Sequence, residues 1–324
     1  MIRVAIVGAG IMGTNHARVL KTNKDCDVVA VIDPDSKAGN ALAKAIGVPW
    51  LPRLETGLTR IDAAVVAAPT ERHTELVCRL LAAGINVLVE KPVCTSLEEL
   101  RQIEFAASRS KGLVMVGHVE RFNPAVLELG RLIGSIVHLD FRRIGPFSPR
   151  IRGDVILDLM IHDIDLALLL TGEFPTYIAA AGRAVKSPFH DTAHAIVAFP
   201  SGVTATFAAS RVAQRKVREV DITQRDDFIS VDLLRQDVTI HRVEHSEYVS
   251  REGATYRQIG HVDIPFLTYR GEPLALQLER FISGIRDGKH PTPSLTDGGR
   301  ALQVALAVRE RLTASQPAVE RHLT

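Results

Sequence analysis

Cysteine is scarce in this sequence. It has three cysteines among 324 residues, Cys26, Cys78 and Cys94, and no two of them form a CxxC pair. A small, odd number of separated cysteines is typical of free thiols in a reducing compartment and provides no disulfide framework. We therefore expect a cytoplasmic protein that is stabilised by its hydrophobic core without crosslinks.

Long apolar runs and a large excess of one charge are also missing. No segment approaches the roughly 18 apolar residues that a membrane helix needs. The apolar residues 1–10 lack the basic segment and long apolar region of a signal peptide, so they are interpreted as a first strand. The net charge of +2, with basic residues spread along the chain, argues against nucleic acid as a partner. A small molecule is the expected partner.

The composition is that of an ordinary globular protein, and the length suggests two domains. Hydrophobic residues make up 46% of the chain and charged residues 23%, both typical values. Domains commonly have roughly 150 residues. The apolar pattern changes after Val119, which predicts a first domain over residues 1–119 and a second over residues 120–324.

The first domain alternates short apolar runs with helical patterns. Strands are expected at Ile2–Val7, Val28–Ile32, Ala63–Ala67, Asn86–Val89 and Leu113–Val116, with helices near 11–22, 35–46, 71–83 and 96–110. This alternation is typical of βαβ units, and strands of nearly continuous Val, Ile and Ala indicate burial on both faces. The prediction is an α/β domain with a doubly wound parallel sheet.

The second domain is rich in predicted strands. A helix is expected near 124–133, a strand at 136–144, an Arg- and Pro-containing loop at 145–153, and a long helix over 154–171 that ends at Gly172. Strands follow at 176–185, 192–199, 203–210, 217–224, 228–234, 238–243 and 262–265, and helices near 273–287 and 298–314 close the chain. The prediction is an α+β domain with a largely antiparallel open sheet.

The strongest local motif is Gly8-Ala9-Gly10-Ile11-Met12-Gly13. It follows a predicted strand and opens a helix, the context in which GxGxxG binds the pyrophosphate of a dinucleotide. The glycines allow a tight turn and a close approach to phosphate, and the helix N-terminus attracts negative charge. We expect Gly8, Gly10, Ile11, Met12 and Gly13 to bind the cofactor in a Rossmann domain; a glycine-rich turn without a ligand is the alternative.

Asp33 follows Gly13 by 20 positions, at the end of the second predicted strand. An aspartate at this distance accepts hydrogen bonds from the ribose hydroxyls of NAD. It also repels the 2′-phosphate of NADP, so NAD is the expected cofactor, although Lys37 lies nearby. The alternative is that Asp33 only caps the next helix.

Polar residues follow several of the parallel strands. Pro69, Thr70 and His73 come after the third predicted strand, and Glu90 and Lys91 after the fourth. The carboxyl ends of parallel strands face one crevice, where ligands bind. We therefore expect these five residues to contribute to the cofactor site.

Lys91 is the first candidate catalytic residue, because it is expected beside the reactive end of the cofactor. An ammonium there stabilises a reacting oxygen, and a partly desolvated lysine has a lowered pKa that suits proton transfer. The alternative is an ordinary surface lysine in a loop.

Asp158 and His162 are four residues apart on a predicted helix and share one face. The helix is apolar nearly all round, which predicts burial, and buried ionisable groups need partners. Our hypothesis is that His162 is the general base, Lys91 its electrostatic partner and Asp158 the group that orients His162. Lys91 as the base, and a structural role for His162, are the alternatives.

Arginines near the predicted 145–153 loop are candidates for substrate binding. Arginine binds two oxygens of a diphosphate with its planar fork. We expect Arg143 and Arg150, together with Arg121 and Asn123 after a strand end, to contact substrate; a solvated basic loop or subunit salt bridges would equally explain the arginines. No metal site is expected, because His190 and His194 lie in a predicted strand region and do not share a helix face.

Three segments together resemble a known family. GAGIMGTNHARVL, Glu90-Lys91-Pro92 and the DLMIHD segment 158–163 are similar to those of the Gfo/Idh/MocA oxidoreductases, which include glucose–fructose oxidoreductase and inositol dehydrogenase. The resemblance covers nearly the whole chain. It implies NAD(P)-linked oxidation or reduction of sugars, a C-terminal sheet that forms a homodimer or homotetramer, and a place for Glu90 beside the nicotinamide pocket.

Residues 117–124, GHVERFNP, and the segment ILDLMIHDIDLAL resemble the family branch that oxidises the 3-hydroxyl of UDP-N-acetylglucosamine. The resemblance implies a ketone product and a downstream aminotransferase. A dehydrogenase of a free monosaccharide or inositol is the first alternative. A non-catalytic NAD(P)-binding sensor is the second, since fold does not dictate function.

Overall fold

The computed structural model describes residues 1–54, 61–148, 153–250 and 253–314. It divides into two compact units. Unit 1 contains Met1–Phe122 and Gly271–Gln303, and unit 2 contains Asn123–Arg270 and the chain from Val304 onward. The two-domain expectation placed residues 271–303 with the second domain; they belong to unit 1 instead.

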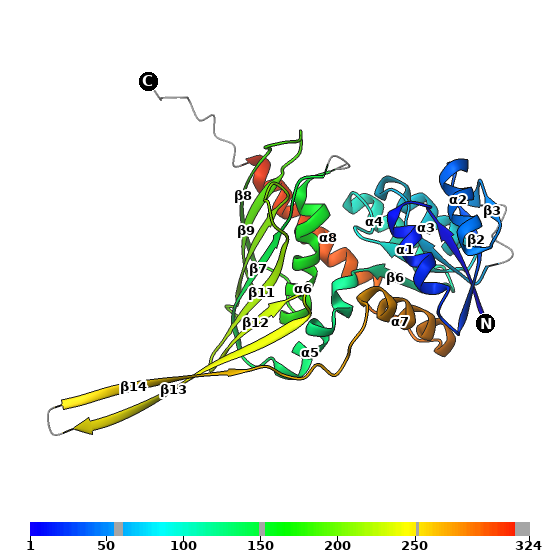
Figure 1. The fold of residues 1–324 in the computed structure, drawn as a ribbon. Helices are drawn as coiled ribbons and strands as arrows, with labels where there is room; N and C mark the ends of the chain where they lie inside the picture. Colours follow the sequence, from blue (N-terminus) through cyan, green and yellow to red (C-terminus); the bar gives the residue numbers. More distant parts are fainter. Residues whose placement is uncertain (55–60, 149–152, 251–252, 315–324) are drawn as a thin grey trace. The chain divides into compact units, whose positions relative to one another are not determined.

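Unit 1 is built on a parallel sheet of six strands in the order β3-β2-β1-β4-β5-β6 (Figure 1). These are β1 (Ile2–Val7), β2 (Cys26–Ile32), β3 (Trp50–Leu51), β4 (Ala63–Val66), β5 (Asn86–Glu90) and β6 (Val114–Gly117). The order reverses between β1 and β4, which is where nucleotides bind in doubly wound sheets. The predicted doubly wound sheet is confirmed; β3 was missed because two residues give no periodic signal.

Helices cover both faces of this sheet, as right-handed crossovers require. They are α1 (Ile11–Leu20), α2 (Ser36–Ile46), α3 (His73–Ala82), α4 (Leu97–Ser108) and the short η3 (Thr70–Arg72) and η4 (Val119–Phe122). The whole of β4 is buried, which explains its continuous Ala and Val.

Helix α7 (Pro273–Asp287) returns to unit 1 from the far end of the sequence. Its apolar face, with Leu274, Leu278 and Phe281, joins the same core as α1 and β1. Burying these side chains against α1 and η4 is the physical reason that residues 271–303 belong to unit 1. The last helix, α8 (Leu295–Ala314), begins in unit 1 and ends in unit 2.

Unit 2 is built on an eight-stranded sheet in the order β14-β13-β12-β11-β7-β10-β9-β8. The strands are β7 (Ile136–Ile144), β8 (Tyr177–Arg183), β9 (Thr192–Ala198), β10 (Thr204–Ser210), β11 (Val217–Gln224), β12 (Phe228–Asp232), β13 (Asp237–Ser250) and β14 (Gly253–Asp263). Only β7 and β10 pair in parallel, so the largely antiparallel sheet is confirmed.

One face of this sheet carries the apolar core of unit 2. Leu139, Phe141 and Arg143 alternate on that face of β7, and the rings of Phe141 and Phe207 stack with centroids 5.1 Å apart. The helices of unit 2 are α5 (Pro124–Leu132), the π-helical turn η5 (Ile156–Met160) and α6 (Ile161–Thr171), and η5 and α6 pack on β7 and β10. Gly172 ends α6 with φ +69°, as expected of a left-handed C-terminal residue.

Two predictions for unit 2 were wrong. Strands β13 and β14 form a long hairpin where only short strands at 238–243 and 262–265 were expected, and in Figure 1 it extends beyond the other strands. The sequence over residues 244–261 has no regular alternation of apolar and polar residues, which is the pattern that predicts a strand. The expected α-helix over 154–171 begins with the wide turn η5, and its α-helical part starts at Ile161.

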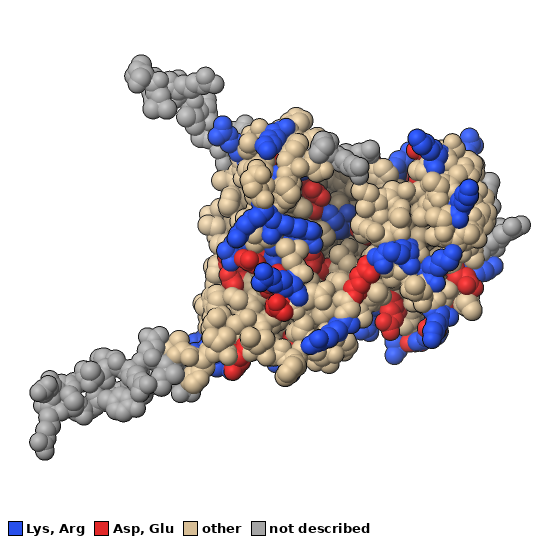
Figure 2. Space-filling model, viewed as in Figure 1, with Lys and Arg blue, Asp and Glu red and all other residues tan. Residues whose placement is uncertain are grey.

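On the face seen in Figure 2, Lys and Arg side chains are interspersed with Asp and Glu side chains over both units. This mixture agrees with the small net charge of the chain. No helix in the described ranges is long and apolar enough to cross a membrane.

Candidate active site

The three glycines of the turn between β1 and α1 differ in whether the fold itself requires a glycine at their position. A Cβ on Gly8 (φ +104°) would lie 2.6 Å from the Ala67 carbonyl oxygen, and one on Gly13 would lie 1.8 Å from the Gly8 carbonyl oxygen. Gly8 and Gly13 are therefore required by contacts within the chain. Gly10 has φ −76°, and a Cβ there would have no heavy atom within 4 Å. Neither strain nor packing requires this glycine.

The space at Gly10 lies at the N-terminus of α1, where no side chain caps the helix. Open space before uncapped N–H groups fits the close approach of a pyrophosphate. Ile11 follows and is exposed, whereas Gly13 is buried against the strand. The residues present therefore fit a bound dinucleotide.

Asp33 lies beside this turn at the end of β2. Its Oδ2 accepts a hydrogen bond from the Ala9 N–H at 2.6 Å, and its Oδ1 accepts one from the Asp35 N–H at 2.8 Å. A carboxylate has about four acceptor positions, so both oxygens retain capacity for ribose hydroxyls. Asp35, and not Asp33, provides the carboxylate that caps α2. The capping alternative for Asp33 is therefore not supported.

His73 connects the segments that follow β4 and β5. It is buried, with Nδ1 at 3.0 Å from the Pro92 carbonyl oxygen and Nε2 at 2.9 Å from that of Ala68. Burial lowers the pKa of His73, against the opposing effect of the two carbonyl groups and of Glu90. Each ring nitrogen lies within hydrogen-bond distance of a backbone carbonyl, so His73 links the two segments, while Pro69 and Thr70 are accessible beside it.

Glu90 forms a buried pair with His16, a residue that the sequence analysis missed. The His16 Nε2 and Glu90 Oε1 atoms are 2.7 Å apart, and Glu90 Oε2 accepts a 3.3 Å hydrogen bond from the Lys91 N–H. Gly117 leaves room for this carboxylate, because a Cβ there would lie 3.1 Å from Glu90 Oε2. His16 lies three residues after Gly13, on the helix face nearest the sheet, and that spacing was the available signal.

The charge of Glu90 is balanced locally. Burial raises the pKa of its carboxyl, but the hydrogen bond and charge of His16 and the charge of Lys91 outweigh burial, so the pKa lies below its usual value. Glu90 is therefore not a solvated loop carboxylate. Lys91 follows it directly at the carboxyl end of β5 and is half-buried, which sets it apart from an ordinary surface lysine.

In unit 2, Asp158 comes from η5 and His162 from the first turn of α6. The Asp158 side chain is 52% exposed, so the predicted burial of this carboxylate was wrong, while His162 is half-buried. The wide π turn explains the difference, since it changes the direction in which Asp158 points relative to an α-helix. Such turns are frequent at functional sites.

The buried charges of unit 2 are others. Arg143 is 2% exposed, and its Nε and Nη2 both bind the carboxylate of Asp163, at 2.7 Å for the shortest contact. This bidentate ion pair connects β7 to α6. Arg143 was expected to bind a substrate diphosphate; its 2% exposure and its pairing with Asp163 favour the salt-bridge alternative.

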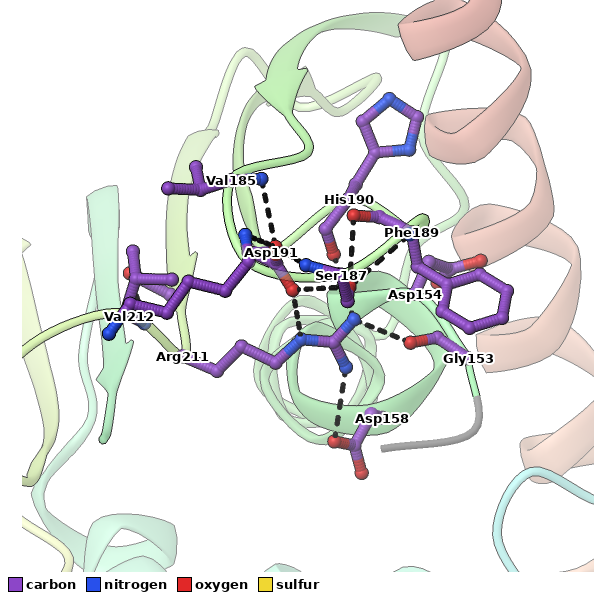
Figure 3. Close-up of polar contacts among 12 residues, drawn as sticks. Gly153, Asp154, Asp158, Val185, Ser187, Phe189, His190, Asp191, Arg211 and Val212 are labelled. Carbon is purple, nitrogen blue, oxygen red and sulfur yellow. Dashed lines mark hydrogen bonds and ion pairs between the residues drawn. The ribbon is translucent and has the colours of Figure 1, made fainter. Parts of the chain in front are cut away.

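A second buried cluster surrounds Asp191 and Arg211 (Figure 3). Asp191 accepts hydrogen bonds from the N–H groups of residues 185–187, from the Ser187 hydroxyl and from Arg211 Nε. Burial raises the pKa of its carboxyl, but these donors lower it far more. No local motif distinguishes either residue in the sequence.

The other residues that were expected to bind substrate lie in different environments. Arg121 is largely buried in unit 1, with Nη1 at 3.3 Å from Asp297 Oδ1. Asn123 caps α5 through its Oδ1, and its Nδ2 donates to the Leu233 carbonyl oxygen at 2.9 Å. The Asn123 side chain is therefore buried and hydrogen-bonded within unit 2, and its contact with substrate stays a prediction. Arg150 lies outside the described residues.

A metal centre is not part of this arrangement as far as the structure describes the chain. Among the described residues, no group of three or more His, Cys, Asp or Glu side chains could hold a metal ion.

A Rossmann sheet with an open glycine turn and an adjacent acidic residue defines a dinucleotide-binding protein. Residues 2–118 match the family model described as an oxidoreductase family with an NAD-binding Rossmann fold, and residues 128–226 match the C-terminal domain model of the same family. The chain belongs to this Gfo/Idh/MocA oxidoreductase family.

Relatives cover nearly the whole chain. UDP-N-acetylglucosamine 3-dehydrogenase of Acidithiobacillus ferrooxidans is 30% identical over 95% of this chain and 96% of its own, and inositol 2-dehydrogenase of Rhizobium meliloti is 29% identical over 94% of each. A solved structure of the Acidithiobacillus enzyme matches with a TM-score of 0.87 over 97% of this chain and 98% of that chain, at 29% identity. The chain is thus an oxidoreductase of an NAD-dependent sugar and inositol dehydrogenase family.

Proposed function

We propose that this enzyme oxidises the 3-hydroxyl of UDP-N-acetylglucosamine to a ketone with NAD⁺. The observation that carries the proposal is the similarity of the whole chain, in sequence and in fold, to a dehydrogenase of that substrate. A dehydrogenase of a free cyclitol is the second candidate, favoured by the 29% identity to inositol 2-dehydrogenase.

The glycine turn and its neighbours in unit 1 would hold the cofactor. Gly10 and the N-terminus of α1 would bind the pyrophosphate, and Asp33 would bind the adenosine ribose. Thr70 and Glu90 belong to the segments that bind the nicotinamide half. When bound, NAD⁺ accepts the hydride from the carbinol carbon.

The proton of the hydroxyl is handled by three side chains. His162 takes the proton as general base. The Lys91 ammonium stabilises the negative charge that develops on the oxygen while the alcohol is oxidised to a ketone. Asp158 orients His162 from the preceding turn. The Glu90 carboxylate, whose pKa is lowered by His16 and by the charge of Lys91, places a negative charge beside Lys91. Lys91 and the other two residues belong to different units, so variants in both units test the assignment.

Arg121 and Arg150 are the proposed diphosphate contacts. The ion pair of Arg121 with Asp297 holds its guanidinium in a fixed orientation. Arg121→Ala is therefore expected to weaken binding of UDP-N-acetylglucosamine, by roughly 1.5–3 kcal/mol for a lost charge-assisted hydrogen bond. Calorimetric titration measures this loss, and the affinity for NAD should stay unchanged.

A substrate panel tests the proposed function directly. The purified chain is incubated with NAD⁺ and UDP-N-acetylglucosamine, free N-acetylglucosamine or myo-inositol, and NADH is followed by absorbance. The proposal expects turnover with the nucleotide sugar and a product that mass spectrometry finds lighter by two hydrogens. Turnover with inositol alone establishes the second candidate, and NAD binding without turnover on any compound indicates a sensor.

The ketone defines the next reaction. A 3-keto sugar nucleotide is a substrate for amination, so the proposed downstream partner is an aminotransferase. We also propose a homodimer or homotetramer formed through the sheet of unit 2, which light scattering tests.

A further inference from the structure

Arg211 follows the last residue of β10 and is buried in unit 2, with its side chain 4% exposed. Three acceptors fix its guanidinium: Nε donates to Asp191 Oδ1 at 2.9 Å, and Nη2 donates to the carbonyl oxygens of Gly153 at 2.6 Å and His190 at 3.2 Å. Figure 3 shows these contacts converging from three different segments. The plane of the guanidinium is therefore determined by the fold.

Asp191 is itself rigidly held. The backbone of the 185–187 turn wraps its carboxylate, and its own N–H and C=O pair with Arg183 and Arg211. The Ser187 hydroxyl adds a 2.6 Å hydrogen bond to Oδ1. The Asp191 carboxylate thus balances the positive charge of Arg211, and no second carboxylate is needed for this purpose.

The remaining donor of Arg211 points elsewhere. Nη1 is buried and makes no hydrogen bond within the described part of the chain, and it lies 3.9 Å from Asp158 Oδ2. That distance is within the range of an ion pair but too long for a hydrogen bond. A buried donor without a hydrogen bond is costly and calls for an explanation.

The same cluster fixes the backbone that carries Asp158. The His190 carbonyl accepts from both Arg211 and the Val155 N–H, and the Arg211 contact to the Gly153 carbonyl holds the residue before the helix. Asp154 then caps the turn by accepting from the N–H groups of residues 156 and 157. The start of η5, and with it the place of Asp158, is determined relative to Arg211.

We propose that Arg211 is a positioning residue of the active site, whose Nη1 holds the Asp158 carboxylate in its working orientation. This inference rests on the proposed function, because it acts through Asp158. The Asp158 side chain is 52% exposed, and a cation fixed 3.9 Å from its Oδ2 favours the orientations that face Arg211. A lysine cannot replace this arginine, since one ammonium cannot reach Asp191, Gly153 and Asp158 in the same fixed plane.

The test compares Arg211→Gln and Arg211→Lys with a matched control in the same cluster. Ser187→Ala removes one hydrogen bond to Asp191 and leaves Arg211 and Asp158 in place. Both Arg211 variants are expected to lower kcat by about tenfold, within the range of couplings between neighbouring residues, with the affinity for NADH unchanged. Ser187→Ala is expected to lower the melting temperature and to leave kcat unchanged.

A double-mutant cycle separates positioning from a structural role. In an Asp158→Asn background, Arg211→Gln is expected to cause little further loss of kcat, because the group that it positions has already been altered. Full additivity of the two losses would overturn the proposal. So would a normal kcat for both Arg211 variants once the folded fraction is taken into account.

The substrate panel keeps this result distinct from the proposed function. The cycle uses whichever compound of the panel the wild-type enzyme oxidises, so a different substrate changes the function and leaves the cycle intact. If no compound is oxidised, the proposed function fails, and the Arg211–Asp158 contact is tested by the same cycle in urea unfolding. A favourable coupling of the two side chains in stability supports the contact, and additivity refutes it.

Discussion

Unit 1 and unit 2 use their charged side chains in different ways. In unit 1 the important groups follow parallel strands, and backbone geometry at glycines 8, 10 and 13 shapes the site. In unit 2 two buried ion pairs, Arg143–Asp163 and Arg211–Asp191, connect elements that are distant in sequence and hold the domain together. Asp158 and His162 are more exposed than these two pairs, and Asp158 lies 3.9 Å from Arg211 Nη1.

This difference helps to interpret the aspartates that lie among apolar residues in η5 and α6. Residues 158–165 contain three aspartates, of which Asp163 and Asp165 are buried and Asp158 is exposed. A buried carboxylate is tolerated only with a partner, so burial marks structure here. Asp158 is the accessible carboxylate of the three, with its side chain 52% exposed.

The largest expected effect tests whether the two units share one reaction. Lys91→Met and His162→Gln should each lower kcat by about 10²–10⁴-fold, the usual contribution of a proton-handling group. Steady-state formation of NADH over a range of pH measures both, and the residue whose loss removes the acidic limb of the kcat profile is the base. Near-normal turnover in both variants would refute the assignment.

The fold of unit 1 could be predicted from the sequence for a physical reason. The glycine turn, Asp33 and the Glu90-Lys91 segment are local signals, and one rule about strand ends brings them together. Even so, His16 escaped, because its partner Glu90 is 74 positions away.

The failures in unit 2 have a common cause. The residues near Arg143 do not predict that its partner is Asp163, and those near Arg211 do not predict Asp191. Each ion pair depends on how distant segments pack in the fold. An arginine beside a proline-rich loop was therefore interpreted as a diphosphate contact. The π turn at 156–160 was also invisible, because its residues are as apolar as those of an ordinary helix.

The second effect concerns the stability of unit 2. Asp163→Ala leaves the Arg143 guanidinium buried without its carboxylate, which should cost about 3–5 kcal/mol. Urea unfolding followed by circular dichroism measures the loss. The paired replacement Arg143→Met with Asp163→Leu should be much less damaging than Asp163→Ala alone. If Asp163→Ala were as stable as the wild type, Arg143 would again be a candidate for substrate binding.

The third effect separates fold from ligand within the glycine turn. Gly13→Ala places a Cβ against the Gly8 carbonyl oxygen and should destabilise unit 1 by about 1–3 kcal/mol. Gly10→Ala meets open space, so its melting temperature without cofactor should match the wild type while its affinity for NAD falls. Equal affinity for NAD in Gly10→Ala and wild type would contradict the placement of the pyrophosphate.

The smallest effect concerns a carboxylate at a helix start in unit 1. Asp297 accepts from both the N–H and the hydroxyl of Ser294, and the Ser294 hydroxyl accepts from the Asp297 N–H. Burial raises the pKa of Asp297, but these hydrogen bonds and the charge of Arg121 lower the pKa by more than burial raises it. The net shift is therefore downward. The folded state therefore binds the proton less readily than the unfolded state does.

A lowered folded pKa gives stability that is complete above the unfolded value of about 4 and is lost as pH falls below it. Asp297→Asn should thus cost about 1 kcal/mol near neutral pH, the usual value of a helix cap, and the difference from wild type should shrink as pH falls through about 4. Asp62→Asn is the control, because the Asp62 carboxylate also has a lowered pKa from its hydrogen bonds to Arg3 but lies at the surface, where solvent screens the pair. Urea midpoints across pH should therefore respond to Asp297→Asn more than to Asp62→Asn, and the reverse order would show that exposure does not decide the strength of these carboxylate contacts.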